Sequence, residues 1–197
     1  MAGKRSTKEI LFDTFFELSQ TKRLDDLTIA DILEHSGISR STFYRHFTDK
    51  YDLMSQFYQH QIAMLYQKNY CESESAWCIQ KKVSYETAKL YYANQEYFAN
   101  ILVHEGQNSF TEASINHGIG YYKNLFKKGG WNEIPADLLF AIEYHCIAAT
   151  EMLNRWVRSG FKLTPEEYCR LLFQTVPETL RENLTKCMLP QDGSKSV

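Results

Sequence analysis

The sequence lacks any apolar run that approaches the ~18 residues needed for a membrane span. It is also poor in chain breakers, with nine glycines and four prolines among 197 residues, which excludes a collagenous or low-complexity chain. Basic residues are not in excess, because 22 Lys and Arg face 24 Asp and Glu and the formal net charge is -2. Taken over the whole chain, this balance argues against a nucleic-acid binder, since such proteins are usually basic.

The marks of an exported or disulfide-bonded protein are missing as well. Glu9, Asp13 and Glu17 fall in an amphipathic pattern near the start, so no signal peptide is expected. The five cysteines, at 71, 78, 146, 169 and 187, have irregular spacing and form no C-x-x-C pair. We expect a cytoplasmic protein with free thiols, in which Cys146 and Cys169 act as small core hydrophobes.

The sequence also has few features of a metal centre or an enzyme. His104, His117 and His145 have no ligand-type partner four residues away, as a helical zinc site would need. There is no glycine-rich phosphate loop and no G-x-S-x-G nucleophile motif. We therefore predict no metal, no cofactor and no enzymatic activity.

What the sequence does contain is helical periodicity, and no stretch alternates as a strand would. Apolar residues near the start recur close to every 3.6 residues. Gly129-Gly130 marks a helix end, and Pro135 suits the first turn of the next helix. The prediction is an all-α fold, in which Pro177 kinks the last helix. The expected helices are 7–20, 28–36, 39–47, 49–68, 79–93, 94–105, 109–128, 136–159 and 164–187.

The segment that begins at Thr28 carries the functional signal, with the sequence TIADILEHSGISRSTFYRHFTDKYDL. Thr28 and Asp31 stand at capping-box spacing, and Gly37 is placed for a left-handed C-cap. Ser39 is expected to cap the next helix, and Thr48 the long helix that follows. A short helix, a glycine turn and a second short helix form the helix-turn-helix arrangement, whose second helix enters the DNA major groove.

The residue types of the second short helix suit contact with DNA. Between Ser39 and Lys50, three basic residues accompany one acidic residue, which gives a local charge of +2. Arg40 is suited to a bidentate bond with guanine, and Tyr44 to donating to a phosphate. Lys50, and the hydroxyl and N–H groups at Thr28, are placed to hold phosphates. The alternative is a solvated helix face with ordinary helix caps. DNA binding is favoured because the match to the helix-turn-helix arrangement extends over twenty-six residues in the right order.

Residues 7–55 resemble the N-terminal domain of the TetR family of bacterial transcriptional regulators. The resemblance rests on T-I-A-D-I-L, S-G-I-S, T-F-Y-R-H-F and D-K-Y-D-L. It implies a three-helix helix-turn-helix domain over 1–55 and a helical effector-binding and dimerisation domain over 56–190. The polar stretch 191–197 is expected to be a disordered tail. Y-Y-A-N-Q-E-Y-F-A-N and R-W-V-R-S-G are faintly similar to the branch of the family that includes dihydroxyacetone-kinase regulators.

The same resemblance implies which residues contact DNA. The chain departs from the family pattern at Ser41, where many members carry Gly or Ala. The resemblance places Arg40, Ser41 and Thr42 against bases, Thr28, Ser39, Tyr44, His46 and Lys50 against the DNA backbone, and Lys4 and Arg5 within reach of DNA ahead of the first helix.

Two helices of the C-terminal half carry seams suited to packing against another helix. Their residues recur at spacings of three and four, as in a heptad pattern. Together the seams predict half of a four-helix interface in a homodimer, as a two-fold DNA site requires; an intramolecular core is the alternative. The predicted interface consists of Leu138, Ile142, His145, Ala149, Met152, Trp156, Tyr168, Leu172, Thr175 and Thr179.

Aromatic residues with polar tips gather in the C-terminal half. Such residues suit an internal pocket between helices, although most of them also fit an ordinary core. The predicted pocket for a small-molecule effector is lined by Tyr91, Tyr97, Phe98, Tyr121, Tyr122, Phe140 and Tyr144.

These patterns favour a ligand-responsive, sequence-specific DNA-binding regulator that acts as a homodimer, most often a repressor in the family that it resembles. The expected partners are a double-stranded DNA operator, a second copy of the chain and an unidentified small-molecule effector, with no membrane. A helical small-molecule carrier, or a protein that keeps the fold but binds a partner regulator instead of DNA, is the alternative. Residues 1–60 hold 8 basic and 9 acidic residues, so non-specific DNA binding is expected to be modest.

Overall fold

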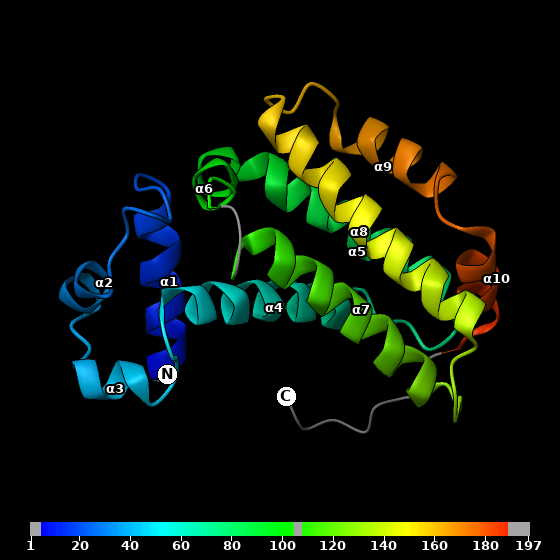
Figure 1. Ribbon diagram of the computed structural model, residues 1–197, viewed down its shortest axis with the longest axis horizontal. Coiled ribbons are helices and arrows are strands. Elements are labelled where there is room, and N and C mark those ends of the chain that lie inside the picture. The colour runs from blue at the N-terminus through cyan, green and yellow to red at the C-terminus, as the bar shows by residue number, and fades with distance from the viewer. Residues whose placement is uncertain (1–4, 105–107, 189–197) are drawn as a thin grey trace. The chain divides into compact units, whose positions relative to one another are not determined.

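The computed structural model describes residues 5–104 and 108–188, and within them it contains ten helices and no β-strand (Figure 1). The predicted all-α fold is confirmed. No helix among these residues is long and apolar enough to cross a membrane. The helices are α1 Thr7–Ser19, α2 Ile29–Ser36, α3 Arg40–Tyr44, α4 Lys50–Asn69, α5 Ala76–Ala93, α6 Gln95–Ile101, α7 Phe110–Lys128, α8 Ala136–Arg158, α9 Pro165–Gln174 and α10 Glu178–Lys186.

Local capping signals set several of these helix ends as predicted. The side chain of Thr28 accepts a hydrogen bond from the N–H of Asp31, whose carboxylate accepts from the N–H of Thr28, so α2 begins with a complete capping box. Ser39 caps α3 with its side chain alone, which accepts from the N–H of Thr42. Gly37 ends α2 with φ 67°, a left-handed conformation that glycine adopts without a steric penalty.

Several predicted helix ends were wrong; α5 begins at Ala76 rather than at 79, and α6 ends at Ile101 rather than at 105. The carboxylate of Asp49, not the hydroxyl of Thr48, accepts from the first N–H groups of α4, at 2.8 Å from the N atoms of Tyr51 and Asp52. The recognition helix α3 ends at Tyr44 rather than at 47, because the chain tightens into i to i+3 hydrogen bonds there. Pro177 breaks the last predicted helix into α9 and α10, since it has no N–H to continue the ladder.

The described residues form two compact units. The first contains residues up to Gln61 together with Ala93–Ser114, so α6 lies in the same unit as α1, α2, α3 and the beginning of α4. Its core is aromatic: the rings of Phe12 and Phe57 lie 5.3 Å apart, and Tyr97 of α6 packs edge-on against Phe15 at 6.3 Å. The unit with the helix-turn-helix is thus completed by a segment far away in sequence.

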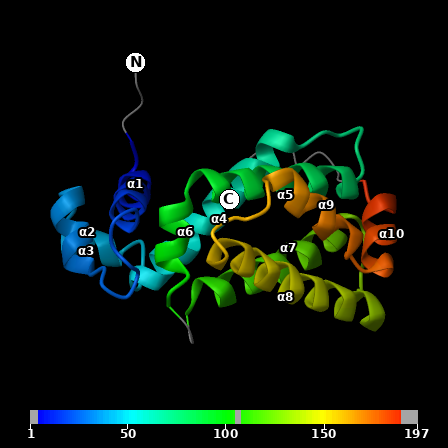
Figure 2. The ribbon, with the colours of Figure 1, turned by 90° about the horizontal axis from the view of Figure 1, so that it is seen from above.

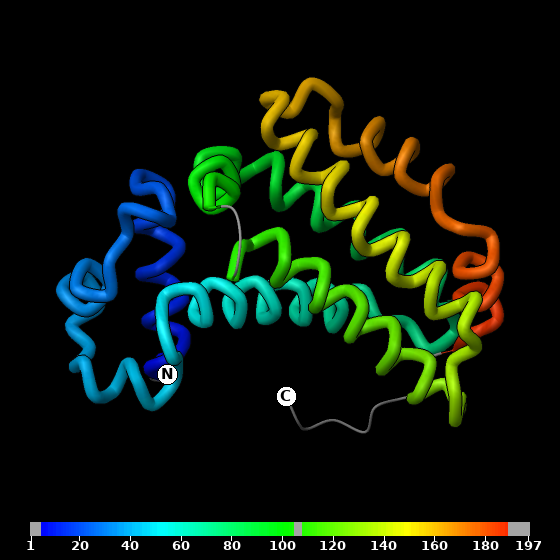
Figure 3. Tube along the Cα trace, in the orientation of Figure 1, coloured from blue at the N-terminus to red at the C-terminus, as the bar shows by residue number. Residues whose placement is uncertain are grey.

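The second unit contains the remaining part of α4, α5, most of α7, and α8, α9 and α10. Helices α8 and α9 run side by side in both views (Figures 2 and 3), and the rings of Trp156 and Tyr168 stack between them at 4.6 Å. The buried core of this unit includes Leu138, Ile142, Leu180 and residues of α7. The predicted functional segments 1–55 and 56–190 do not coincide with these units; their boundary stays a prediction, and 191–197 lies outside the described residues.

Candidate nucleic-acid interface

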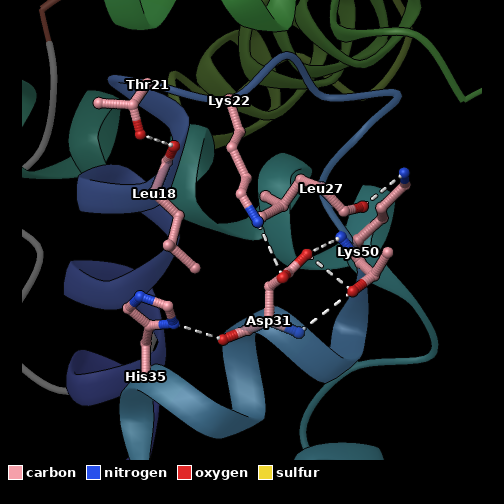
Figure 4. A network of polar contacts seen from close by, with 8 residues as sticks. Leu18, Thr21, Lys22, Leu27, Asp31, His35 and Lys50 are labelled. Carbon is pink, nitrogen blue, oxygen red and sulfur yellow. Dashed lines mark hydrogen bonds and ion pairs between the residues drawn. The ribbon is translucent and has the colours of Figure 1, made fainter.

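A network of polar contacts fixes the start of α2, the first helix of the helix-turn-helix (Figure 4). Asp31 accepts from the N–H of Thr28 at 2.9 Å and from the Lys22 ammonium at 2.8 Å. The hydrogen bond from Lys22, followed by those from Thr28, holds the pKa of the Asp31 carboxyl well below its usual range. The carboxylate therefore contributes to stability at neutral pH, and the contribution is lost as the pH falls through this lowered pKa.

Alanine in place of Thr28 is expected to lower the free energy of unfolding by about 1 kcal/mol, because the N–H of Asp31 loses its acceptor. Urea denaturation monitored by circular dichroism measures this change. The control is Thr185→Ala, since the Thr185 hydroxyl only bonds the carbonyl of Arg181 in its own helix and the residue is exposed. Its effect should stay within about 0.5 kcal/mol. An equal loss in both variants would contradict the capping role.

Helix α3 presents a polar surface above a buried anchor. Phe43 is fully buried, while Arg40, Ser41, Tyr44 and His46 are exposed. The structure thus places most of the predicted recognition residues of α3, and His46 just after it, at accessible positions, while Thr42 is half-buried. A helix with one packed aromatic and several exposed donors has the form that reads base edges in the major groove.

Hydrogen bonds order the beginning of α3. The Ser39 hydroxyl accepts from the N–H of Thr42 at 3.2 Å and donates to the Thr42 hydroxyl at 2.9 Å. The Arg45 guanidinium donates to the same Thr42 oxygen at 3.3 Å. Arg45 is exposed and was missed as a site residue, although the charge count between Ser39 and Lys50 already contained it. Its guanidinium lies at the end of α3, bonded to Thr42, one of the predicted DNA-contacting residues.

Lys50 begins α4, and its ammonium group is engaged within the protein. Its Nζ donates to the carbonyl oxygens of Leu24 at 2.7 Å, Asp25 at 3.1 Å and Leu27 at 2.7 Å, the last of which Figure 4 draws. An ammonium has three N–H donors, so these three acceptors saturate it. A phosphate would have to replace one of the carbonyls, and the predicted phosphate contact of Lys50 stays a prediction.

The residues predicted ahead of α1 are only partly covered by the structure. Arg5 is exposed and forms an ion pair with Asp13 at 3.1 Å, which is a weak surface contact that DNA is able to displace. Lys4 lies outside the described residues. The approach of this segment to DNA therefore rests on the sequence alone.

Comparison with known proteins agrees with this arrangement. Residues 16–57 match the family of bacterial regulatory proteins called the tetR family, and residues 81–178 match a transcriptional regulator C-terminal region. The first match covers the capped α2, the Gly37 turn and α3, whose geometry is described above. The chain belongs to the TetR family of transcriptional regulators. It is therefore a DNA-binding regulator and not an enzyme.

Solved structures share the fold of this TetR-family protein at low sequence identity. The dihydroxyacetone kinase operon activator DhaS is 18% identical with a TM-score of 0.59, over 93% of this chain and 98% of that one. A TetR transcriptional regulator from Streptococcus agalactiae 2603V is 20% identical with a TM-score of 0.59, over 87% and 94%. The fatty acid degradation regulator FadR from Bacillus halodurans is 16% identical with a TM-score of 0.59, over 88% and 96%. No curated protein sequence matches significantly.

The predicted dimer seam of the TetR-family protein needs a correction on α8 and α9. Leu138, Ile142, Trp156 and Tyr168 are buried within the chain's own second unit, where they pack against neighbouring helices. They are therefore unavailable to a second copy. Of the other predicted interface residues, Met152 and Thr175 are exposed and His145, Ala149, Leu172 and Thr179 are half-buried.

The predicted effector pocket also needs a correction, because Phe140 and Tyr144 lie on the surface of α8. Tyr97 and Phe98 pack inside the first unit, against each other at 4.8 Å. Tyr91 and Tyr122 are buried in the second unit, and Tyr121 is half-buried there.

A smaller aromatic cluster forms around Tyr121. Its ring stacks on that of Tyr66 at 4.2 Å and lies 5.6 Å from Tyr122, which in turn lies 6.0 Å from the ring of His145. Tyr66 donates a hydrogen bond to Gln80. Burial lowers the pKa of His145 to about 4 and raises the pKa of Tyr122 far above its usual value, so both side chains are neutral at pH 7.

The cysteines of the second unit behave as core residues. Burial raises the pKa of the Cys146 thiol to about 12 and that of Cys169 to about 11. The thiolate is the reactive form, so these two thiols are poor nucleophiles at neutral pH. Within residues 5–104 and 108–188, no three His, Cys, Asp or Glu side chains gather as they would around a metal ion.

Proposed function

We propose that this TetR-family regulator binds a two-fold operator as a homodimer in the cytoplasm and represses transcription until a small-molecule effector releases it. The observation that carries the proposal is the exposed polar face of α3, with Arg40, Ser41 and Tyr44 around the buried Phe43. Repression as the direction of control rests on the family resemblance. Release by an effector is an allosteric coupling between the second unit and DNA binding.

Selection from a random pool of DNA duplexes tests the proposal. The wild-type protein is expected to enrich an inverted repeat whose half-sites lie about one helical turn apart. Placed upstream of a reporter gene, the enriched sequence should lower expression when the protein is present. A pool that shows no enriched sequence at low salt would contradict DNA recognition, and higher expression would contradict repression.

Alanine at Arg40 is expected to weaken binding to the selected operator by about 1–3 kcal/mol and to relax the preference at one base pair in each half-site. The reason is the loss of a bidentate contact to one base. Fluorescence anisotropy on the operator and its single-base variants measures both effects. Arg181→Ala, which removes an exposed arginine of α10, is the control with the same charge change. Equal losses on operator and random DNA would show that Arg40 contacts the backbone.

The dimer surface that we propose is the exposed face of α8. Phe140, Tyr144 and Ile147 recur there at spacings of four and three, and all three are large exposed hydrophobic residues. The same face continues into Glu151 and Arg155, which form an ion pair at 2.9 Å. An apolar stripe with a charged end is typical of helices that pair between subunits. This face replaces the seam predicted from the sequence.

The effector site that we propose is the aromatic cluster of Tyr66, Tyr121, Tyr122 and His145. The hydrogen bond from Tyr66 to Gln80 joins two neutral groups and His145 is neutral at pH 7, which suits a neutral ligand with hydrogen-bonding groups. A thermal-shift screen with matched sets of neutral and charged metabolites tests this. Neutral compounds should raise the melting temperature, and the shift should disappear in Tyr121→Ala. Stabilisation only by anions or cations would contradict the proposal.

A further inference from the structure

The loop between α1 and α2, residues 20–28, is held by groups from outside the helix-turn-helix. Leu24 and Leu27 in this α1–α2 loop are fully buried, so their backbone groups need partners inside the protein. Lys50 supplies a donor for both carbonyls. The N–H of Leu24 donates to the carbonyl of Asn100 in α6 at 3.1 Å. Helix α6 therefore supplies the acceptor for a buried N–H group, that of Leu24, which the helix-turn-helix itself does not pair.

Asn100 binds the loop through its side chain as well. Its amide Nδ2 donates to the carbonyl oxygen of Ser19, the last residue of α1, at 3.0 Å. One residue thus bonds the chain at the end of α1 and again at Leu24. These bonds join residues that lie 81 and 76 positions apart in the sequence. The position of the loop is therefore fixed against α6, and not only by the residues next to it in the chain.

His104, which follows α6, forms the second part of this contact. Its Nδ1 lies 2.7 Å from a carboxylate oxygen of Asp25, and because a carboxylate only accepts, the Nδ1 proton is donated to it. The imidazole ring also stacks on Tyr51 of α4 at 4.8 Å and 29°. The ring is therefore fixed between the loop and the first turn of α4.

The held loop leads directly into the DNA-reading helices. It ends at Thr28, the cap of α2, and the Gly37 turn connects α2 to α3. Lys22 in the loop also binds Asp31 in the first turn of α2. A displacement of the loop would therefore displace the start of α2, and through the turn it would change the orientation of α3.

We propose that Asn100 and His104 are positioning residues for DNA binding: from α6 they hold the α1–α2 loop in the position that orients α2 and α3 for the major groove. Neither residue contacts DNA in this role. The proposal rests on the DNA-binding function and adds to it residues that lie outside the helix-turn-helix segment.

The test compares full-length variants in two measurements. Asn100→Leu removes the amide donor at similar volume, and His104→Ala removes both the bond to Asp25 and the stack on Tyr51. Hydrogen–deuterium exchange of the free protein reports on the loop, and anisotropy titration reports on binding to operator DNA selected by the wild type. His104→Asn restores a donor near the Nδ1 position, and Glu96→Gln, at an exposed position of α6, is the control.

We expect faster exchange confined to residues 20–28 and the first turn of α2, and about five- to tenfold weaker operator binding in both variants, which corresponds to the loss of one or two hydrogen bonds. The salt dependence should keep its slope, because no phosphate contact is lost. His104→Asn should recover part of the affinity, and Glu96→Gln should match the wild type.

Several results would overturn the proposal. Affinity within twofold of the wild type would show that α6 does not position the DNA-reading helices. Faster exchange throughout α1 and α3 would show a general loss of stability instead of a displaced loop. If the wild type enriches no DNA, the DNA-binding proposal itself fails, while the exchange of the loop still reports whether α6 holds it.

Discussion

Glutamate in place of Phe140 or Ile147 is expected to convert the protein from a dimer into a monomer and to weaken operator binding by roughly a hundredfold. These side chains are 72% and 53% exposed on one face of α8, and an interface formed there would bury them. A buried, unpaired carboxylate at the centre of an interface costs several kcal/mol, and a monomer contacts only one half-site. Sedimentation velocity measures the association state, and anisotropy titration measures the affinity.

The matched control for this prediction is Met64→Glu, because Met64 is a hydrophobic residue on α4 that is nearly as exposed (52%) as Ile147. It should leave both the association state and the operator affinity unchanged. A Phe140→Glu protein that remains dimeric and binds the operator normally would show that this face of α8 is not the subunit interface. A wild-type protein that is monomeric at micromolar concentration would contradict the homodimer.

The two seams of α8 explain why the sequence predicted a dimer face that the structure largely buries in the core. Leu138, Ile142 and His145 repeat at the same spacings as Phe140, Tyr144 and Ile147, but each residue of the second set lies two positions after its counterpart, which is about 200° around the helix. Spacing identifies a helix face that packs and does not reveal what packs against it. The structure places Leu138 and Ile142 of the first face in the core, and for this reason we propose the second face as the surface that packs against a partner.

Local signals were the part of the fold that the sequence predicted well. The capping box of Thr28 and Asp31 and the left-handed Gly37 depend on residues within a few positions of each other, and both are present in the structure. The bonds of Asn100 and His104 join groups 81 and 79 positions apart. No periodicity or motif encodes such a pairing, because it arises only when the helices pack. For this reason the sequence predicted the polar face of α3, but it did not predict that α6 supports the unit that contains α3.

Removal of the Lys50 ammonium is expected to have the largest effect of any single change at the start of α4. Lys50→Ala leaves the carbonyls of Leu24, Asp25 and Leu27 without their charged donor. We expect the free energy of unfolding to fall by about 2–4 kcal/mol. This loss is larger than the contribution of one such hydrogen bond but smaller than that of three, because the entropy cost of ordering the lysine side chain offsets part of the gain. Urea denaturation measures the loss.

A suitable control for the stability change is Lys68→Ala, at the other end of α4. Lys68 is exposed and pairs with Glu86 at 3.4 Å, and a surface pair of this kind contributes less than about 1 kcal/mol. Comparable losses in the two variants would contradict the role that we assign to Lys50. Lys50→Arg should recover little of the lost stability, because a planar guanidinium does not match three carbonyls that converge on one ammonium.

The salt dependence of operator binding separates the two roles open to Lys50. A lysine that neutralises one phosphate contributes about 0.9 to the slope of log K against log salt, so its removal would flatten the line by that amount. A lysine that is saturated by carbonyls lowers the affinity by displacing the α1–α2 loop and leaves the slope as it was. We expect weaker binding of Lys50→Ala with an unchanged slope. A flatter slope would instead mean that the ammonium exchanges a carbonyl for a phosphate when DNA arrives.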